Sequence, residues 1–435
     1  MTALSIVYMP VAELKPANRN ARTHSKRQIR KIADSIKQWG FKNPVLCDAD
    51  NRIVCGHGRL EAATMAGLAE VPVIRADDLS PEQLRAFAIA ENKLSELGGW
   101  STEDLKLELS ELEATFDLTL TGFDTADIDR LLSDEVVSPS EDNSWANAEL
   151  PMQPVSRSGD IWEIGNHRII CGDARLADTY VRLLGSERAQ MVITDPPYNV
   201  KIDGHVSGLG SVKHREFEMA SGEMTTEQFQ SFLGSIMTQL TAFSSAGSVH
   251  FIFMDFRHMQ DVLSAANGIY QELLNLCVWV KTNGGMGGLY RSQHELVFVF
   301  KAGKGVHINN VELGKHGRYR TNVWRYAGIN SFGKNRDAAL SAHPTVKPVD
   351  LVADAILDCS KRRGVILDAF LGSGTMIVAA EQTGRRGFGI ELDPAYVDVA
   401  VERACRACGK PAILSGTSLT FAQIKTQRQS VGGLA

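Results

Sequence analysis

The second part of the chain alternates short apolar runs with helical stretches, and this alternation restricts the fold more than any other feature of the sequence. The apolar runs have strand length and are punctuated by Gly and Asp; in order they are HRIICGD, QMVITD, SVHFIFMD, LCVWVK, HELVFVFK, GVILDAF and GFGIEL. Continuous apolar runs separated by helices are typical of a mostly parallel sheet that is covered on both faces. We therefore expect a doubly wound, Rossmann-like α/β domain over residues 158–410.

The first part of the chain has a different composition. Residues 1–132 mix the short strand-like runs PVLCDA, RIVCG and VPVIRA with helical stretches such as RQIRKIADSIKQWG and EDLKLELSELEATF, which predicts a small α+β domain. Residues 133–157 are rich in Ser, Pro and acids, and their apolar residues follow neither the helical nor the strand period. They are predicted to form a linker. Residues 411–435 are left as a C-terminal tail. Two domains suit a chain of 435 residues.

Composition excludes several classes of protein. The 44% hydrophobic and 22% charged residues are ordinary for globular domains. No run approaches the roughly 20 apolar residues of a membrane helix, and the first residues lack a signal-peptide layout, so we expect a cytoplasmic protein with no membrane partner. Seven scattered cysteines do not form a disulfide framework. The single CxxC pair, Cys405 and Cys408, has no further ligands near it in sequence, so no metal is expected.

A glycine-rich turn follows one of the predicted strands, in GVILDAFLGSGTMIVAAEQTG. Glycines let the backbone approach a ligand closely at the start of a helix. The turn matches neither GxGxxG nor GxxxxGK[ST], so a pyrophosphate or triphosphate is not indicated. Glu391 ends the next strand, where a carboxylate can accept bonds from both ribose hydroxyls. This predicts an adenosyl-ligand pocket, with a structural turn and a surface acid as the alternative; its residues at the turn are Asp368, Phe370, Gly372, Gly374 and Thr375.

A second turn, QMVITDPPYNV, places Asp195, Pro196, Pro197 and Tyr198 at a strand end. The exocyclic amine of a base is a poor nucleophile because its lone pair is delocalised. Asp195 can accept one amino hydrogen and a neighbouring carbonyl the other, both more strongly as the nitrogen becomes positive. The prolines remove two N–H donors, and Tyr198 offers a face for a flipped base. The alternative is a strand terminator with a helix-capping Asp and a core Tyr.

At these residues the chain resembles the amino-group DNA methyltransferases, with DPPY as motif IV and FLGSG as motif I. The catalytic motif precedes the cofactor motif, as in the permuted β group, and the resemblance spans residues 158–410. It implies S-adenosylmethionine as cofactor and methylation of adenine N6 in double-stranded DNA, by base flipping and direct transfer. Asp195 favours adenine, because cytosine-N4 members more often carry Ser there. Methylation of cytosine N4 is one alternative; the other is a DNA-binding adaptor, formed by the first part of the chain, whose methyltransferase half is inactive.

The same resemblance assigns further residues. Asp173 in ICGDA corresponds to the motif III acid near the adenine of the cofactor, and Glu295 lies on the strand that precedes the recognition region. The run HPTVKPVDLVADAIL resembles motif X, so that His343, Thr345 and Lys347 would line the methionine end of the cofactor. Cytosine-C5 methylation needs a Pro-Cys turn, which the chain lacks, and no cleavage motif stands out. The recognition sequence and the existence of a partner endonuclease stay open.

Residues 302–342 are polar and Gly-rich and are expected to be an inserted target recognition segment. From Lys301 to His343 there are eight Lys or Arg against two acids, which favours phosphate contact, although a solvated loop is the alternative. The Gly-rich residues 200–222 are predicted to be mobile and to order over the flipped base. The side chains predicted to contact DNA are Arg318, Arg320, Arg325, Lys334 and Arg336.

Residues 5–100 resemble the N-terminal domain of the ParB family. That resemblance implies a nucleotide site, but His57 replaces the usual Glu and Lys93 follows the Glu-Asn pair in place of an arginine, so a docking or DNA-positioning domain is the alternative. The expected partners are therefore double-stranded DNA, a second copy of the chain as a homodimer, and a nucleotide at the N-terminal domain. The residues that would hold its phosphates are Gly56, Gly58, Arg59, Glu91 and Asn92.

Overall fold

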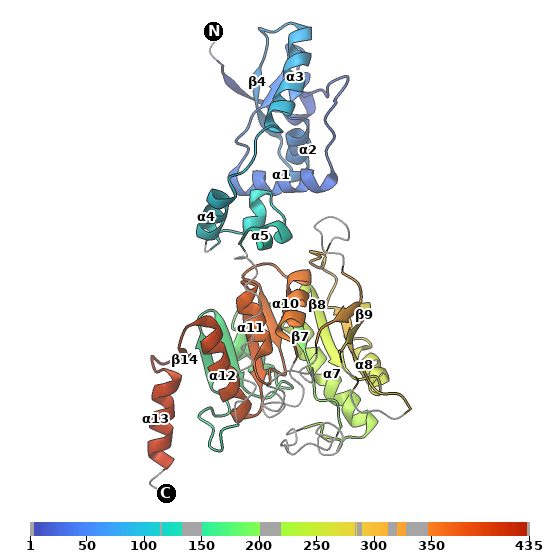
Figure 1. The fold of residues 1–435 in the computed structure, drawn as a ribbon. Coiled ribbons are helices and arrows are strands. Elements are labelled where there is room, and N and C mark those ends of the chain that lie inside the picture. The colour runs from blue at the N-terminus through green and yellow to red at the C-terminus, as the bar shows by residue number, and fades with distance from the viewer. Residues whose placement is uncertain are drawn as a thin grey trace. The chain divides into compact units, whose positions relative to one another are not determined.

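The computed structural model describes residues 4–113, 115–132, 150–200, 219–282, 284, 289–311, 320–327 and 347–432. The chain forms two compact units, residues 1–134 and 135–435 (Figure 1). Figure 1 shows strands and helices in both of them.

The N-terminal unit is built on a four-stranded sheet in the order β1-β4-β2-β3, in which β2 and β4 are parallel and the other neighbours antiparallel. The three strands predicted from sequence are confirmed as β2 to β4, and both predicted helices as α1 and α4. The elements are β1 (Ile6–Pro10), η1 (Val11–Glu13), α1 (Lys26–Trp39), β2 (Val45–Cys47), β3 (Ile53–Cys55), α2 (His57–Ala66), β4 (Glu70–Arg75), α3 (Pro81–Ser95), α4 (Thr102–Leu112), η2 (Leu118–Thr121) and α5 (Thr125–Leu132).

Local sequence explains how α1 is formed and packed. Ser25 is its N-cap and accepts a bond from the Gln28 N–H. Ile29, Ala33 and Ile36 recur on one face and are buried in a cluster that also contains Ala62 of α2. On α2, the neighbouring Ala63 belongs instead to the cluster of buried sheet residues, so α2 packs against both α1 and the sheet.

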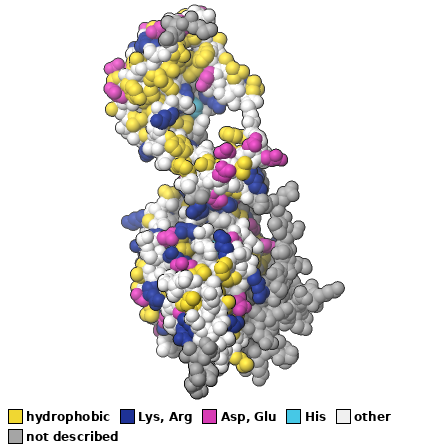
Figure 2. Space-filling model, turned by 90° about the vertical axis from the view of Figure 1, so that its left-hand side faces the viewer, with side chains coloured by type: hydrophobic (Ala, Val, Ile, Leu, Met, Phe, Trp, Pro, Cys, Tyr) yellow, Lys and Arg dark blue, Asp and Glu magenta, His cyan; other side chains and the backbone are white. Residues whose placement is uncertain are grey.

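The helix α3 behaves differently. Ser80 and Gln83 form a capping box with Pro81 in the first turn, yet none of its residues is buried. Phe87, Ile89 and Leu94 are among its exposed side chains. Figure 2 shows apolar side chains spread widely over the visible face of the N-terminal unit.

The second unit is built on a ten-stranded sheet in the order β11-β9-β10-β8-β7-β12-β13-β6-β5-β14. Its strands are β5 (Ile161–Ile164), β6 (His167–Cys171), β7 (Ala189–Thr194), β8 (Ser244–Met254), β9 (Glu272–Val280), β10 (His294–Lys301), β11 (Val323–Arg325), β12 (Val365–Asp368), β13 (Arg386–Glu391) and β14 (Ala412–Leu414). Its helices are α6 (Ala177–Leu184), α7 (Thr226–Ala242), α8 (Met259–Ala266), α10 (Val349–Cys359), α11 (Thr375–Gln382), α12 (Pro394–Cys408) and α13 (Phe421–Gly432).

All seven strands predicted for this unit are confirmed, as β6, β7, β8, β9, β10, β12 and β13. The five central strands β8, β7, β12, β13 and β6 are parallel to one another. Antiparallel pairing appears on both sides of them, where β10 joins β8 and β5 joins β6. The short strands β5, β11 and β14 were not predicted, because three or four residues carry too little pattern.

Helices cover both faces of this sheet. In β12, Ile366 packs into one hydrophobic cluster with residues of α10, α11 and α12, whereas Val365 and Leu367 pack into another with residues of α6, α7 and α8. This alternation follows from the period of two in a strand. The expected doubly wound α/β fold, preceded by a small α+β unit, is confirmed.

Two segments outside the expected domains contact the folded second unit. In the expected C-terminal tail, residues 411–435, β14 pairs with β5, and the ring centres of Phe421 and Trp162 lie 5.0 Å apart. At the other end, the N–H groups of Val155 and Ser156 donate to the buried carboxylate of Asp398, so the expected linker 133–157 runs into the folded unit. No helix in the described ranges is long and apolar enough to cross a membrane.

The contacts of Asp398 decide where the second unit can be cut. A fragment of residues 150–435 should fold, whereas one of residues 158–435 should lose about 3 kcal/mol or more in free energy of unfolding, because two bonds to a buried carboxylate disappear. Urea unfolding of both fragments measures the difference. Asp398→Asn in the longer fragment is the matched control and should weaken the same contacts; equal stability of all three proteins would contradict the assignment.

Candidate active site

Four neighbouring parallel strands deliver acidic side chains to one edge of the large sheet. The strands β7, β12, β13 and β6 are adjacent and run in one direction. At or just beyond their carboxyl ends stand Asp195, Asp368, Glu391 and Asp173, and all four line a single cavity. Ligands of open α/β sheets bind at this edge. The fold thus brings the two turns predicted from sequence into one site.

The glycine turn lies between β12 and α11. Gly372 has φ 52° and Gly374 has φ 85°, a backbone conformation that glycine adopts without a steric penalty. A Cβ atom at Gly374 would lie 3.2 Å from Cα and Cβ of Ala400 on α12. The turn therefore requires glycine for its backbone and for its close packing on α12.

The acids around this turn are bonded to backbone N–H groups. Glu391 accepts from Gly372 N at 2.8 Å and from Asp393 N at 3.0 Å. Asp368 accepts from Phe370 N at 3.0 Å and from the Thr194 hydroxyl at 2.8 Å. Burial raises the pKa of both carboxyls to about 7, although these bonds favour the charged forms. Both groups therefore change charge near neutral pH.

The turn after β7 is occupied by a compact polar network. The Tyr198 hydroxyl donates to Asp195 Oδ1 at 2.7 Å and to Glu295 Oε2 at 3.2 Å. The Lys347 ammonium lies 2.5 Å from Asp195 Oδ2 and 3.1 Å from Glu295 Oε2. Lys281 pairs with the other Glu295 oxygen. Two carboxylates and two ammonium groups thus meet at the Asp195 turn.

Burial and charge act in opposite directions on this network. Burial raises the pKa of Asp195, and the Lys347 ammonium offsets this only in part. Burial also raises the pKa of Glu295, but Lys347 and Lys281 together outweigh it and hold that pKa at about 2. For Lys347 burial lowers the pKa, while Asp195 and Glu295 raise it above its ordinary value. Glu295 is therefore the more firmly charged carboxylate of the two.

The cavity collects most of the residues predicted for the catalytic turn and the cofactor pocket. Its lining includes Asp195, Pro196, Pro197, Tyr198, Asp173, Asp368, Phe370, Gly372, Thr375, Glu391 and Lys347. Gly374 belongs to the turn but packs on α12. His343 and Thr345 lie outside the described residues. Sequence reasoning missed Arg175, Met219, Phe232, Phe253, Asp393 and Tyr396, which also line the cavity.

Some of the missed residues had a local signal. Asp393 caps α12, with Pro394 in the first helical position, so a helix start was readable two residues after Glu391. Arg175 holds Asp173 through several bonds, including one from Nη2 at 2.6 Å. By contrast, Phe232 on α7 and Phe253 on β8 reach the cavity from distant segments, and no local pattern marks them.

The expected DNA-contacting residues are only partly described. Arg318, Lys334 and Arg336 lie outside the described residues, as does most of the segment 200–222 predicted to close over the base. The Arg320 guanidinium bonds to Asp354, Asp358 and Tyr326, so it contributes to internal packing, and its contact with DNA stays a prediction. Arg325 on β11 is exposed, so it stays a predicted DNA contact.

Three of the residues predicted to hold a nucleotide, Gly56, Gly58 and Arg59, stand at the start of α2, whereas Glu91 and Asn92 belong to α3. Gly56 is the N-cap of α2 with φ 103°, and the Arg59 side chain folds back to within 3.1 Å of where a Gly56 Cβ would lie. The buried Arg59 Nε atom has no hydrogen-bond partner among the described residues. Asn92 donates to the Ala88 carbonyl of its own helix. Nucleotide binding by these residues, including Gly58 and Glu91, stays a prediction.

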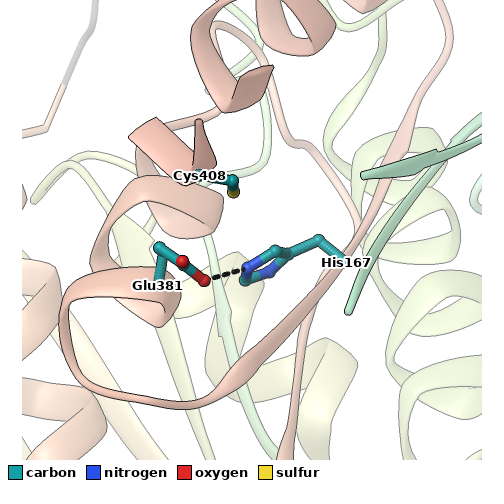
Figure 3. A group of neighbouring side chains, drawn as sticks. All are labelled: His167, Glu381 and Cys408. Carbon is teal, nitrogen blue, oxygen red and sulfur yellow. Dashed lines mark hydrogen bonds and ion pairs between the residues drawn. The ribbon is translucent and has the colours of Figure 1, made fainter. Parts of the chain in front are cut away.

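Away from the cavity, His167, Glu381 and Cys408 point toward one another (Figure 3). A metal would need the lone pair of His167 Nε2. However, His167 Nδ1 accepts a bond from Gly387 N at 2.8 Å, so the neutral ring carries its proton on Nε2, which lies 2.8 Å from Glu381 Oε2. The ring therefore donates to Glu381 and links β6, β13 and α11. The cysteines of the described residues form no disulfide bond.

Comparisons with protein families agree with this geometry. Residues 189–402 match the N6/N4 DNA methylase family, residues 2–93 match the ParB N-terminal domain, and residues 103–158 match the helix-turn-helix domain of ParB-methyltransferases. The sequence patterns did not distinguish this third domain, which includes α4 and α5, from the rest of residues 1–132. The family match identifies a DNA methyltransferase of the N6/N4 type. The chain thus carries an N6/N4 DNA methylase domain and an N-terminal ParB domain.

Individual proteins resemble one unit or the other. The ParB-like nuclease domain-containing protein YnaK of Escherichia coli (strain K12) is 50% identical over 80 residues, 18% of this chain and 92% of that protein. The type II methyltransferase M.HpaI of Haemophilus parainfluenzae is 26% identical over 256 residues, 55% of this chain and 74% of that protein. The crystal structure of the M1.HpyAVI–SAM complex is 19% identical, with a TM-score of 0.40, and covers 54% of this chain and 97% of its own.

The packing of the glycine turn can be tested by adding one carbon. Gly374→Ala should lower the free energy of unfolding by more than the about 1–2 kcal/mol expected for a left-handed alanine, because its Cβ also meets Ala400. Gly409→Ala is the matched control, since Gly409 has φ 62° and nothing within 4 Å of the added carbon. Urea unfolding compares them, and an equal loss would show that Ala400 does not constrain the turn.

Proposed function

We propose that the chain methylates N6 of adenine in double-stranded DNA with S-adenosylmethionine as methyl donor. The observation that carries the proposal is the common cavity of the Asp195 turn and the Gly372 turn, with Glu391 beside the latter. An amine acceptor and a nucleoside pocket in one cavity suit transfer from an adenosyl cofactor to a base.

The residues of the glycine turn fit an adenosyl cofactor. Glu391 can accept bonds from ribose hydroxyls, and Gly372 lets a ligand approach the backbone without a Cβ in the way. Much of the remaining lining is apolar, including Phe370, Leu392 and Tyr396. When bound, the cofactor supplies a methyl group on a positively charged sulfur. No phosphate-binding motif accompanies the turn, which suits a ligand without phosphates.

At the other end of the cavity, the residues act on the base. Asp195 accepts an amino hydrogen and stabilises the positive charge that develops on the nitrogen. Tyr198, whose hydroxyl is fixed by Asp195 and Glu295, presents its ring to a base swung out of the duplex. The turn contains no thiol, so the amine would take the methyl group directly from the sulfonium: the S–C bond would break as the N–C bond forms, the neutral thioether would leave, and one amino hydrogen would be lost as a proton.

The choice between adenine N6 and cytosine N4 rests on Asp195. The lone pair of both amines is delocalised into the ring, so both need the same activation. Enzymes that methylate cytosine N4 more often carry serine at the position of Asp195. The exposed Arg325 and the positive surplus between Lys301 and His343 support contact with DNA phosphates. Methylation-aware sequencing of DNA from cells that express the protein identifies the base and the recognition site together.

Asp195→Ala tests the chemical role directly. The rate of methyl transfer to duplex DNA should fall about a hundredfold or more, because one preorganised acceptor is removed from a buried site. Binding of S-adenosylmethionine should change little, since Glu391 and Gly372 lie at other strand ends. Single-turnover methylation and cofactor titration separate the two effects. A transfer rate near that of the wild type would contradict the catalytic assignment.

The affinity for S-adenosylmethionine should depend on pH. Glu391 accepts ribose hydroxyls as a carboxylate, and its pKa, raised by burial to about 7, lies far above the ordinary value of 4.5. Protonation therefore weakens binding as the pH falls through 7, by about tenfold between pH 8 and pH 6. Calorimetric titrations across this range measure the slope.

Two variants assign that slope. Glu391→Gln should bind weakly at every pH and lose most of the dependence. Asp368→Asn is the control, because the pKa of Asp368 is also about 7, yet its oxygen is bonded to Thr194 and Phe370. A slope that persists in Glu391→Gln and disappears in Asp368→Asn would move the assignment to Asp368.

A further inference from the structure

The Lys347 ammonium presents a difficulty for the proposed chemistry. It lies 2.5 Å from Asp195 Oδ2, so it cancels much of the negative charge that Asp195 would offer to a developing positive nitrogen. Lys347 is also positive itself and would repel that nitrogen. Efficient transfer therefore requires the ammonium to move away from Asp195 when the amine arrives.

Glu295 offers Lys347 a second partner in the right place. Its Oε2 lies 3.1 Å from the ammonium, and its other oxygen is held by Lys281. Glu295 is the second residue of β10 and lies directly opposite Trp279 of β9. Because β9 ends at Val280, Lys281 follows immediately on this neighbouring strand. Glu295 and Lys281 are not among the residues that line the cavity, and Glu295 contacts the lining through Tyr198 and Lys347.

Aromatic rings restrict where the ammonium can go. Lys347 Nζ lies 5.0 Å from the ring centre of Phe253 and 5.8 Å from those of Tyr198 and Trp279. Rings within about 6 Å of a cation attract it through their faces. The side chain of Lys347 is only 8% exposed. The ammonium is thus enclosed between two carboxylates and three rings, with a short path from Asp195 to Glu295.

We propose that Glu295 is a positioning residue for methyl transfer: it draws the Lys347 ammonium off Asp195 when the base amine enters, so that the Asp195 charge faces the amine. Lys281 anchors Glu295 in this role. The inference rests on the proposed function. Beyond that function, Glu295 is a second carboxylate, not part of the cavity lining, that sets the effective charge of Asp195.

The proposal predicts opposite effects of two variants on the titration of Asp195. The charged or titratable groups that face Asp195 are Lys347 before α10, Glu295 on β10, Tyr198 in its own turn and Asp368 at the end of β12. Loss of the Glu295 charge removes a repulsion and leaves Lys347 wholly to Asp195, which lowers the pKa of Asp195. Loss of the Lys347 charge raises it.

The experiment is the pH profile of single-turnover methylation of duplex DNA by the full chain. Glu295→Gln should lower the plateau rate at least tenfold and move the acid limb to lower pH, while the dissociation constant of S-adenosylmethionine stays within about twofold. Lys347→Met should move the acid limb to higher pH. Glu295→Asp, which keeps the charge, should recover part of the plateau rate.

Lys281→Met is the second variant if Glu295→Gln does not fold. It leaves Glu295 charged but less compensated, so the acid limb should move to higher pH, opposite to Glu295→Gln. A purely structural role would lower the rate without moving the limbs in opposite directions. Profiles of the Glu295 and Lys281 variants that superimpose on an active wild type overturn the inference. A wild type that methylates no DNA at any pH overturns the proposed function instead.

Discussion

The second unit depends on one constraint, which is that four neighbouring parallel strands end at the same edge of the sheet and each is followed or ended by an acidic residue. Like charges that are close together and partly buried are costly unless each is compensated. The chain compensates them in different ways. Asp368 and Glu391 receive backbone N–H bonds, Asp173 is held by Arg175, and Asp195 is paired with Lys347. These differences separate the cofactor end of the cavity from the catalytic end.

The catalytic end also extends beyond its own motif. The DPPY turn supplies Asp195 and Tyr198, but Glu295 on β10 and Lys281 after β9 control the ammonium that neutralises Asp195. Both strands belong to the antiparallel side of the sheet. The parallel strands therefore position the groups proposed to react, whereas the neighbouring antiparallel strands position the charges that compensate them.

The two units differ in the charge that they present. Residues 103–132, within the match to the ParB-methyltransferase helix-turn-helix domain, contain nine acids and two bases, so this stretch has no positive surplus for phosphate contact. Part of that acidity is used internally, since Asp124 pairs with Arg27 and Lys31 of α1. The positive surplus lies instead between Lys301 and His343, in the unit that carries the chemistry.

The sequence by itself determined the seven main strands, the fold class, both turns and the acids Asp195, Asp368 and Glu391, because a strand, a turn and its glycines are local and leave local patterns. It did not reveal the partners of Arg320, because Asp354 and Asp358 stand more than thirty positions away. It assigned Lys347 to the cofactor, whereas its ammonium bonds to Asp195, 152 positions earlier. Only the tertiary structure decided these pairings, because the energy of a charge depends on which distant groups the fold places beside it.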